Sequence, residues 1–444
     1  MLEFLIIAFR YFFVFYIIYF LWQAVCYILI ERNRLNKDKN IPIIKQRITI
    51  AFIHIKSFFI LSGGTNINII LYGALWLILF VLFTTFAKKI YKNSCPLIWN
   101  GMFFLTSIGS IILFRLNYSL AIMQLTWLFI SCIVLSILPI GIQILPKLEK
   151  LQTVYLLVGI SLLSSTFIVG TEEFGSLRFI RIGEFGFSPA ELVSFTYILY
   201  LATAFRKKLT FKNLIFPSCM AAMHIAILSL QRNLGGALIF FVSYMVIMYI
   251  STGRVILFGI GITLFSIAST LAYHLFWHVQ VRVAVWQNPW ADVHGIGYQI
   301  IQSLFSIGTW GAFGIGLTRG IPNTVPVVTR DLTFAAVAEE FGIIFALGII
   351  CIYIMLFYRG VNVALRCKRR YYSLIAIGFT CVLTFQTILI IGGTINLIPL
   401  TGVTLPFISY GGTSLLTSVV MIGMVQWIFS YYENLEEYDV ELQQ

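Results

Sequence analysis

Apolar runs of about 20 residues recur along the whole chain, and no other feature constrains its fold as strongly. A helix of that length crosses the roughly 30 Å hydrocarbon core of a lipid bilayer. Charged residues make up 11% of the 444 residues, against about 25% in a soluble domain. Because so few charges cannot cover a globular surface, the sequence predicts an all-α, polytopic membrane helical bundle. Strand-length alternation of apolar and polar residues is lacking, which disfavours a transmembrane barrel.

Hydropathy predicts twelve membrane spans along the sequence. We expect them at residues 11–30, 68–87, 99–116, 119–143, 152–170, 189–205, 213–230, 234–251, 254–277, 335–357, 371–394 and 404–430. The first run lacks a small-residue cleavage site and is typical of an anchor rather than a signal peptide. Segment 48–62 is shorter and carries Lys56 in its middle, so we expect an interfacial or re-entrant helix there.

Basic residues orient the predicted spans, since Lys and Arg collect in cytoplasmic loops. Alternate loops carry Lys88, Lys89, Lys92, Lys147, Lys150, Arg206, Lys207, Lys208, Lys212, Arg254, Arg359, Arg366, Lys368, Arg369 and Arg370. The net charge of +13 is thus explained by loops between spans, which argues against a nucleic-acid-binding patch. The segments around 117, 171–188, 231–233 and 278–334 are then external. The side of the N-terminus stays open, because ERNRLNKDKN has cytoplasmic character while one preceding span would place it outside.

The predicted organisation has three parts. Residues 1–98 form an N-terminal extension with about two transmembrane helices and the interfacial segment. Residues 99–435 form a transmembrane core, and 436–444 form a cytoplasmic tail. The external segment 278–334 interrupts the core, and connections of that length are usually functional. Its apolar pieces argue against a loop that merely floats in solvent, which is the alternative.

Cysteine and histidine give no sign of a metal centre in this sequence. The seven cysteines are scattered and form no CxxC pair, so they are expected to pack as small apolar residues. His274 and His278 have the i,i+4 spacing of a metal pair, but no third ligand lies near them, which favours an ordinary helix end. Walker A and GxSxG motifs are also lacking.

Acidic side chains in or beside apolar runs are candidates for function, because a carboxylate in a membrane is costly. Asp331 ends the long external segment, and Glu339 and Glu340 follow about two helical turns later. Asp331 could instead be a helix N-cap, and the two glutamates could instead bond to loop backbone. Glu191 near the start of span 189–205 could line a cavity or occupy the first turn after Pro189.

Arginines gather in the same external segments as these carboxylates. Arg178 and Arg181 lie in GSLRFIRIGEFGFSPAEL, and Arg282 and Arg319 lie in the long loop. Arginine binds phosphate oxygens bidentately, so an anionic headgroup at the outer leaflet is expected. The competing interpretation is snorkelling toward interfacial lipid phosphates.

Five segments in order resemble the motifs of the SEDS family, the FtsW, RodA and SpoVE proteins. They are LRFIRIGEFGFSPAEL (177–192), QRNLGGAL (231–238), RVAVWQNPWADVHGIGYQIIQS (282–303), TRDLTFAAVAEEFG (329–342) and IPLTGVTLPFISYGGTS (398–414). The resemblance runs from about residue 99 to 431 and implies a ten-helix core, with the extra N-terminal helices outside it.

The resemblance implies a peptidoglycan glycosyltransferase that polymerises lipid II, an undecaprenyl-diphosphate-linked saccharide, beside a class B penicillin-binding protein. The family's essential aspartate falls on Asp331. The site residues then include Arg178 and Arg282 as diphosphate clamps and Tyr298 and Gln299 as positioning residues. The other substrate-binding candidates are Glu191, Gln231, Glu339, Glu340 and Ser409.

This chemistry has physical requirements that the residues meet. A base must take the proton of the attacking sugar hydroxyl, and positive charge or a divalent cation such as Mg²⁺ or Mn²⁺ must stabilise the leaving diphosphate. Asp331 could be the base or could help to hold the cation, and the sequence does not choose between them.

Some residues depart from the family's pattern. Ser188, Ala190 and Ser194 stand where the family has Gln, Ser and usually Lys, and Asn233 stands for Asp. Thr329–Arg330 replaces His–Thr ahead of Asp331. Two alternatives to an active enzyme stay open. The polytopic form and internal polar residues also suit a flippase for lipid-linked oligosaccharides, and the departures suit a catalytically silent scaffold.

Overall fold

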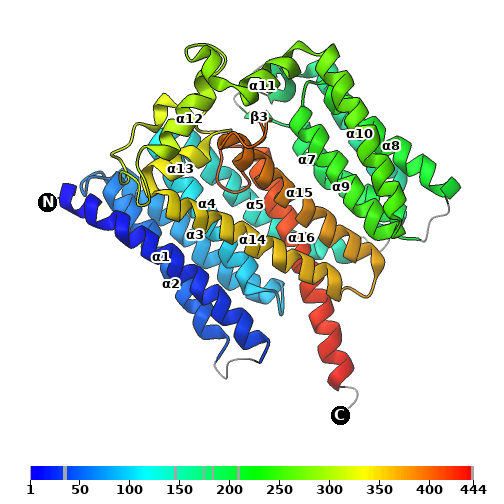
Figure 1. Ribbon diagram of the computed structural model, residues 1–444. Helices are drawn as coiled ribbons and strands as arrows, with labels where there is room; N and C mark the ends of the chain where they lie inside the picture. The colour runs from blue at the N-terminus through cyan, green and yellow to red at the C-terminus, as the bar shows by residue number, and fades with distance from the viewer. Residues whose placement is uncertain are drawn as a thin grey trace.

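The computed structural model describes residues 2–33, 38–144, 148–173, 176–182, 185–207 and 211–441 as a bundle of long helices (Figure 1). Short helices and a small sheet lie at one end of the bundle. The helices are α1 (Leu2–Glu31), α2 (Asn40–Leu61), α3 (Ile67–Ile90), α4 (Pro96–Leu116), α5 (Tyr118–Ile144), α6 (Gln152–Val169), α7 (Pro189–Phe205), α8 (Phe211–Leu230), α9 (Leu234–Thr252), α10 (Val255–Leu275), α11 (Trp277–Gln287), α12 (Tyr298–Gly308), α13 (Thr333–Phe341), α14 (Ile343–Arg366), α15 (Arg370–Thr394) and α16 (Gly412–Glu441). The 3-10 turns are η1 (Leu148–Lys150), η2 (Pro289–Asp292) and η3 (Pro322–Thr324).

The predicted fold class is confirmed, since each of the twelve predicted spans overlaps a long helix. Among the described residues, eleven helices have the length and apolar character needed to cross a membrane. The span predicted at 189–205 is α7, an apolar helix of 17 residues that falls just below that length. The protein is therefore a multi-pass membrane protein.

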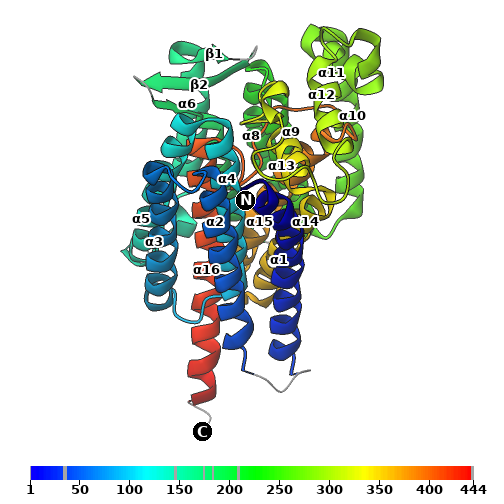
Figure 2. The ribbon, with the colours of Figure 1, turned by 90° about the vertical axis from the view of Figure 1, so that its left-hand side faces the viewer.

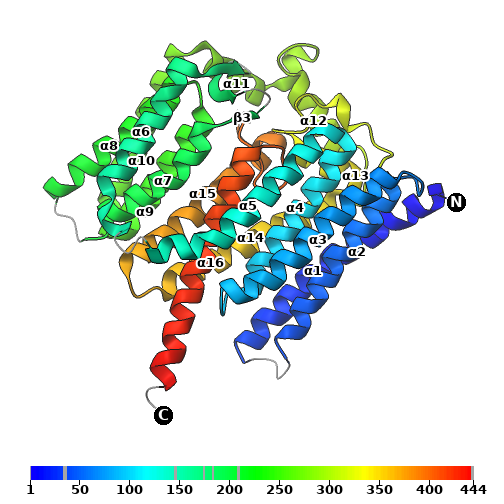
Figure 3. The same ribbon diagram turned by 180° about the vertical axis from the view of Figure 1, so that it is seen from behind.

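Helix α2 is longer than the interfacial segment expected at 48–62. It has 22 residues, begins at Asn40 and packs against α1, α3 and α4. Figure 3 shows α1, α2 and α3 side by side along one flank of the bundle. We infer that α2 crosses the membrane, which places the connection between α1 and α2 at the cytoplasmic end, the end that carries the C-terminus in Figure 2. The cytoplasmic character of that connection then agrees with the number of crossings.

Polar side chains join this extension to the first helix of the core. Asn100 of α4 donates to the Gln46 side chain at 3.0 Å, and His54 lies 2.8 Å from the Ser107 hydroxyl. Interhelical hydrogen bonds of this kind hold helices together in lipid, where apolar burial gives little net attraction. Helix α4 lies among these and other helices of the core, and 94% of the residues in its membrane-spanning window are buried within the chain.

The span predicted at 335–357 is wrong at its start, because the helix breaks at Gly342. This glycine has φ 92°, and a β-carbon there would lie 2.4 Å from the Ala312 carbonyl oxygen. The break separates the short helix α13 from α14. Since α14 continues to Arg366, Arg359 lies within the helix rather than in a loop, and pairs with Glu31 of α1 at 2.6 Å.

The external end carries structure that hydropathy did not predict. Strands β1 (Thr171–Glu173), β2 (Ser176–Ile182) and β3 (Phe185–Phe187) form an antiparallel sheet in the order β1-β2-β3. Strands β1 and β3 have three residues each, which is too few for an alternation pattern to show them. The long loop 278–334 contains α11 and α12. The loop between α15 and α16 is also longer than expected, because α16 begins at Gly412 and not near 404.

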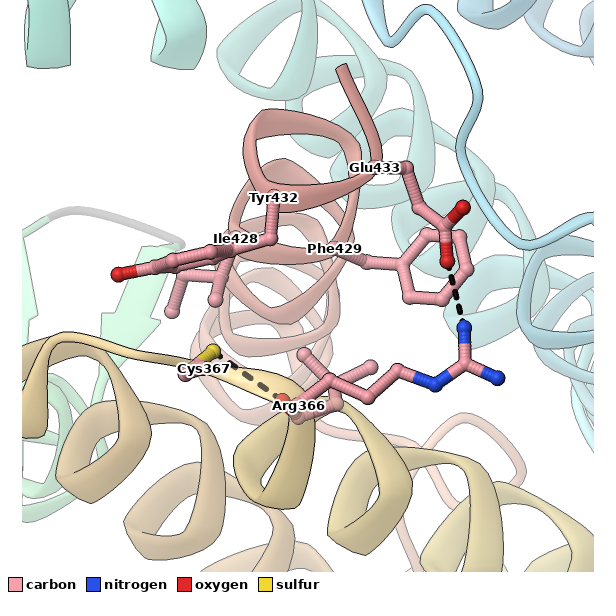
Figure 4. A pocket seen from close by; sticks show the side chains of 7 residues that line it. Arg366, Cys367, Ile428, Phe429, Tyr432 and Glu433 are labelled. Atoms are coloured by element: carbon pink, nitrogen blue, oxygen red, sulfur yellow. Dashed lines mark hydrogen bonds and ion pairs between the residues drawn. The ribbon is translucent and has the colours of Figure 1, made fainter. Parts of the chain in front are cut away.

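At the cytoplasmic end, α14 is fastened to α16. Arg366 and Glu433 point toward one another and form an ion pair of 2.5 Å (Figure 4). The Tyr432 hydroxyl accepts a hydrogen bond of 3.0 Å from the backbone N–H of Arg369. These contacts fix the start of α15 against α16.

Candidate active site

The external end brings Asp331 together with three arginines from segments far apart in the sequence. Asp331 lies near the end of the long loop, just before α13. Arg178 lies on β2, and Arg282 lies on α11. The third arginine, Arg330, precedes Asp331. All three bear electrostatically on the Asp331 carboxylate.

A local turn sets the direction of Asp331. Val327 has φ 54°, and its carbonyl accepts hydrogen bonds from the N–H groups of Arg330 at 3.0 Å and Asp331 at 3.2 Å. The N-cap of α13 is Leu332, without a side-chain cap bond. The interpretation of Asp331 as a helix N-cap is therefore wrong, and its carboxylate is left for the arginines.

Gly402 lies where Arg178 and Asp331 meet. Its φ is 72°, a left-handed conformation that suits glycine. A β-carbon built there would lie 3.0 Å from Arg178 Nη2 and 3.4 Å from Asp331 Oδ2. These two atoms flank the same point, so the guanidinium and the carboxylate are at most about 6.4 Å apart, close to the range over which charges shift each other's pKa.

Backbone carbonyls of the loop before α16 hold the arginines in place. Arg178 donates to the Gly402 carbonyl, and its Nε donates to the Ser176 hydroxyl at 2.5 Å. Arg282 donates to the Leu400 carbonyl at 3.0 Å. Both side chains are half-buried, so they keep N–H groups that an anionic ligand could reach.

Arg330 is the functional candidate that the motif reading missed. Its guanidinium lies over the rings of Phe179 at 5.3 Å and Tyr410 at 5.9 Å. The Tyr410 N–H also donates to the Thr329 carbonyl at 2.8 Å, which ties the SYGG turn to this segment. The signal was present in the sequence, because this arginine replaces a neutral family residue directly before Asp331.

Burial and positive charge act on Asp331 in opposite directions. Burial raises the pKa of the carboxyl above its ordinary value, while Arg178, Arg330 and Arg282 lower it in that order of importance. The net direction is upward. A carboxylate with a raised pKa is a better proton acceptor than an ordinary aspartate, while nearby arginines hold it charged.

Comparison with known proteins identifies the family of this chain. The family model described as cell cycle protein, FtsW/RodA/SpoVE, matches residues 94–434. The chain belongs to this family. The family match begins after the three-helix extension, so the ten-helix core consists of α4 to α10 and α14 to α16.

Curated relatives carry names from all three branches of the family. The peptidoglycan glycosyltransferase RodA of Mycobacterium tuberculosis is 35% identical over 57% of this chain and 58% of its own length. The stage V sporulation protein E of Bacillus subtilis is 30% identical, over 59% of this chain and 74% of its own length. The probable peptidoglycan glycosyltransferase FtsW of Coxiella burnetii is 31% identical, over 65% and 81%. The chain thus spans little more than half the length of the mycobacterial RodA proteins that it matches.

Solved structures share the fold. One similar chain comes from a structure of a peptidoglycan synthase complex, described as the structural coordination of polymerization and crosslinking. Its TM-score to this chain is 0.65 at 25% identity, and the match covers 77% of this chain and 99% of that one. The rod shape determining protein RodA of Thermus thermophilus has a TM-score of 0.55 at 23% identity, covering 76% and 97%.

The three glutamates predicted at the site differ in burial and in what they contact. Glu191 lies in the first turn of α7, half-buried, and acts electrostatically on Arg178. Glu339 and Glu340 are buried: Glu339 accepts from Ile321 N–H at 2.7 Å and from the Ser306 hydroxyl. Arg115 of α4 donates to Glu340 at 3.1 Å. The last two therefore make the loop contacts expected of structural residues, and they brace the segment that leads to Asp331.

Two further motif residues also support the site from below. The Gln231 side chain is buried and donates to the Leu163 carbonyl at 2.8 Å, and the backbone carbonyl of Gln231 accepts from Leu177 N–H at 3.1 Å, next to Arg178. The Ser409 hydroxyl donates to Thr333 at 3.0 Å and so joins the SYGG turn to α13. Neither group reaches the Asp331 carboxylate.

The structure explains one of these departures, at position 233. Asn233 is the N-cap of α9 and accepts from Gly236 N–H at 3.2 Å, a role in which Asn and Asp are equivalent. The Ser194 hydroxyl donates to the Glu191 carbonyl at 2.6 Å. Ser188 and Ala190 are buried at the start of α7, and nothing in the structure explains the choice of residue there.

Tyr298 and Gln299 open α12, which packs against α13. Both are half-buried, and in the described part of the chain neither forms a hydrogen bond to the Asp331 group. Their predicted positioning role stays a prediction.

The described residues contain no group of three His, Cys, Asp or Glu side chains that could hold a metal ion, so a divalent cation at this site would depend on Asp331 and the phosphates of a substrate. Three arginines around Asp331 supply positive charge directly.

Proposed function

We propose that the protein is a peptidoglycan glycosyltransferase that polymerises lipid II at the outer face of the bacterial cytoplasmic membrane. The observation that carries the proposal is one carboxylate, Asp331, facing Arg178 and Arg282 at the external end of a membrane bundle. The family and the names of its curated members support the reaction class.

In the proposed reaction, Asp331 takes the proton from the 4-hydroxyl of the acceptor sugar. The hydroxyl oxygen then bonds to the anomeric carbon of the second substrate, and the bond from that carbon to the diphosphate oxygen breaks. The products are a longer glycan and undecaprenyl diphosphate. A positioned general base contributes about 10² to 10⁴ in rate.

The arginines would stabilise the charge that builds up on the leaving diphosphate. Arg178 and Arg282 are held by backbone carbonyls, and Arg330 is held by two aromatic rings, so little reorganisation is needed as charge develops. The negative charge of Glu191 would keep Arg178 protonated and oriented toward the site. We assign Gln231, Glu339, Glu340 and Ser409 to the support of these groups.

A class B penicillin-binding protein is the proposed partner, since a new glycan strand must be crosslinked. The related chain in a peptidoglycan synthase complex supports an assembly of this type.

The test is polymerisation of fluorescent lipid II by purified protein in proteoliposomes, followed by gel separation of the glycan products. We expect wild type to make polymer and Asp331→Asn to lose at least about 100-fold in rate. Asp292→Asn is the matched control, because Asp292 lies in the same external segment and bonds to Gly295 and Ile296 N–H groups.

Three outcomes would contradict the proposal in whole or in part. Translocation of lipid II without polymer would favour the flippase. Full polymerisation activity of Asp331→Asn would show that Asp331 is not the general base. Normal growth of cells that rely on that variant would favour the silent scaffold.

A further inference from the structure

A cavity of about 450 Å³ opens at the cytoplasmic end, on the side of the membrane opposite to Asp331. Its walls come from three separate elements: η1, the end of α7 with the residues that follow, and the start of α15. The lining residues are Glu149, Arg206, Lys207, Arg369, Arg370 and Tyr371. The size is typical of small-ligand sites.

The cavity has excess positive charge. Glu149 pairs with Arg206 at 2.8 Å and neutralises it. Arg370 donates to the Ser251 carbonyl, which leaves its charge uncompensated. Lys207 and Arg369 form no ion pair in the described part of the chain. Three net positive charges therefore face one volume, whereas nearby Arg366 is already paired with Glu433.

The backbone adds to this field. Arg369 is the N-cap residue of α15, which runs for 25 residues, and no side chain caps that end. The N–H groups of the first helical turn and the helix dipole favour an anion at this position. The Arg369 N–H itself is bound by the Tyr432 hydroxyl, which fixes the geometry of the helix start.

The cavity is shallow and open to solvent, and its lining brings cations from separate elements to one place: Lys207 and Arg369 are exposed, while Arg206 and Arg370 are half-buried. Basic pockets between transmembrane helices on this side of a membrane bind anionic headgroups.

We propose that this cavity binds the phosphate group of an anionic phospholipid of the inner leaflet. Arg370, Lys207 and Arg369 supply the charge, and the start of α15 supplies N–H donors. The Glu149–Arg206 pair completes the lining.

The experiment uses the full-length protein in phosphatidylcholine nanodiscs, with and without phosphatidylglycerol, and measures thermal unfolding. We expect phosphatidylglycerol to raise the unfolding temperature of wild type by about 3 °C. The double variant Lys207→Gln with Arg369→Gln should lose most of that rise. The control Lys88→Gln with Lys89→Gln removes equal charge from exposed positions at the end of α3 on the same face, and should keep it.

The outcomes separate the sources of the phosphate. Inorganic phosphate could instead raise the unfolding temperature of wild type in pure phosphatidylcholine, with the rise lost in the same double variant. That result would support the phosphate site and reassign its ligand to a soluble anion. An equal rise in wild type, the double variant and the control would mean diffuse surface attraction and would overturn the proposal, as would no rise at all in wild type.

Discussion

Replacing Arg178 with glutamine should move the pH dependence of polymerisation in a defined direction. The guanidinium and the Asp331 carboxylate are at most about 6.4 Å apart. At an effective dielectric constant of about 20, two unit charges at that distance interact by about 2.6 kcal/mol, or about two pKa units. Both side chains are only half-buried, so solvent screening reduces the expected effect to about one unit.

The sign follows from the role of the carboxylate. Asp331 must be deprotonated to act as a base, and burial already holds its pKa above the ordinary value. Loss of the opposing positive charge raises that pKa further. The acid limb of kcat/KM should therefore shift upward by about one pH unit in Arg178→Gln, measured as lipid II polymerisation between about pH 5 and 9.

Two variants control for structural damage. Arg178→Lys keeps the charge and should leave the acid limb near its wild-type position, even if the rate falls. Arg181→Gln removes an exposed arginine from the same strand and should shift it by less than about 0.3 unit. An unchanged or lowered limb in active Arg178→Gln would show that this guanidinium does not act on the base.

Two further substitutions test the surroundings of the site, and a pair of fusions tests the topology. Gly402→Ala should lower kcat/KM by about tenfold with little change in unfolding temperature, because the new β-carbon would strain the turn and displace Arg178. Glu340→Gln should lower the free energy of unfolding by about 2 kcal/mol, as the buried pair with Arg115 is lost, whereas Glu172→Gln at an exposed pair should change it by less than about 0.5 kcal/mol. A phosphatase that is active only outside the cytoplasm should be inactive when fused after residue 38 and active after residue 66; equal activity would show that α2 does not cross.

The spans were predictable because lipid imposes one simple requirement on every crossing helix. The ends of the helices were less predictable, since Gly342 breaks a helix inside an apolar stretch and α16 begins at Gly412, after an apolar loop. Helix α2 was predicted only as a short interfacial or re-entrant helix because Lys45, Arg47 and Lys56 lower its hydropathy, although its contacts with the other helices accommodate Arg47 and Lys56. Arg47, for example, donates to the Asn100 side chain at 3.4 Å, and Lys56 donates to the Tyr16 hydroxyl at 2.5 Å.

The site was predictable in part. The motifs indicated Asp331, Arg178 and Arg282, but not that they converge at Gly402, since that depends on long-range packing of loops. Arg330 was visible only as a departure from a pattern. Its placement between two rings depends on β2 and the SYGG turn, and neither neighbour can be inferred from the local sequence.

The three-helix extension has a consequence for assembly in the membrane. Because α1, α2 and α4 belong to one polypeptide, their association is intramolecular and does not depend on the abundance of any second protein. The flank formed by α4 is occupied from synthesis onward, and the Glu31–Arg359 pair holds α1 on the neighbouring helix α14. An anchor helix from another protein must therefore dock on a different side of the core.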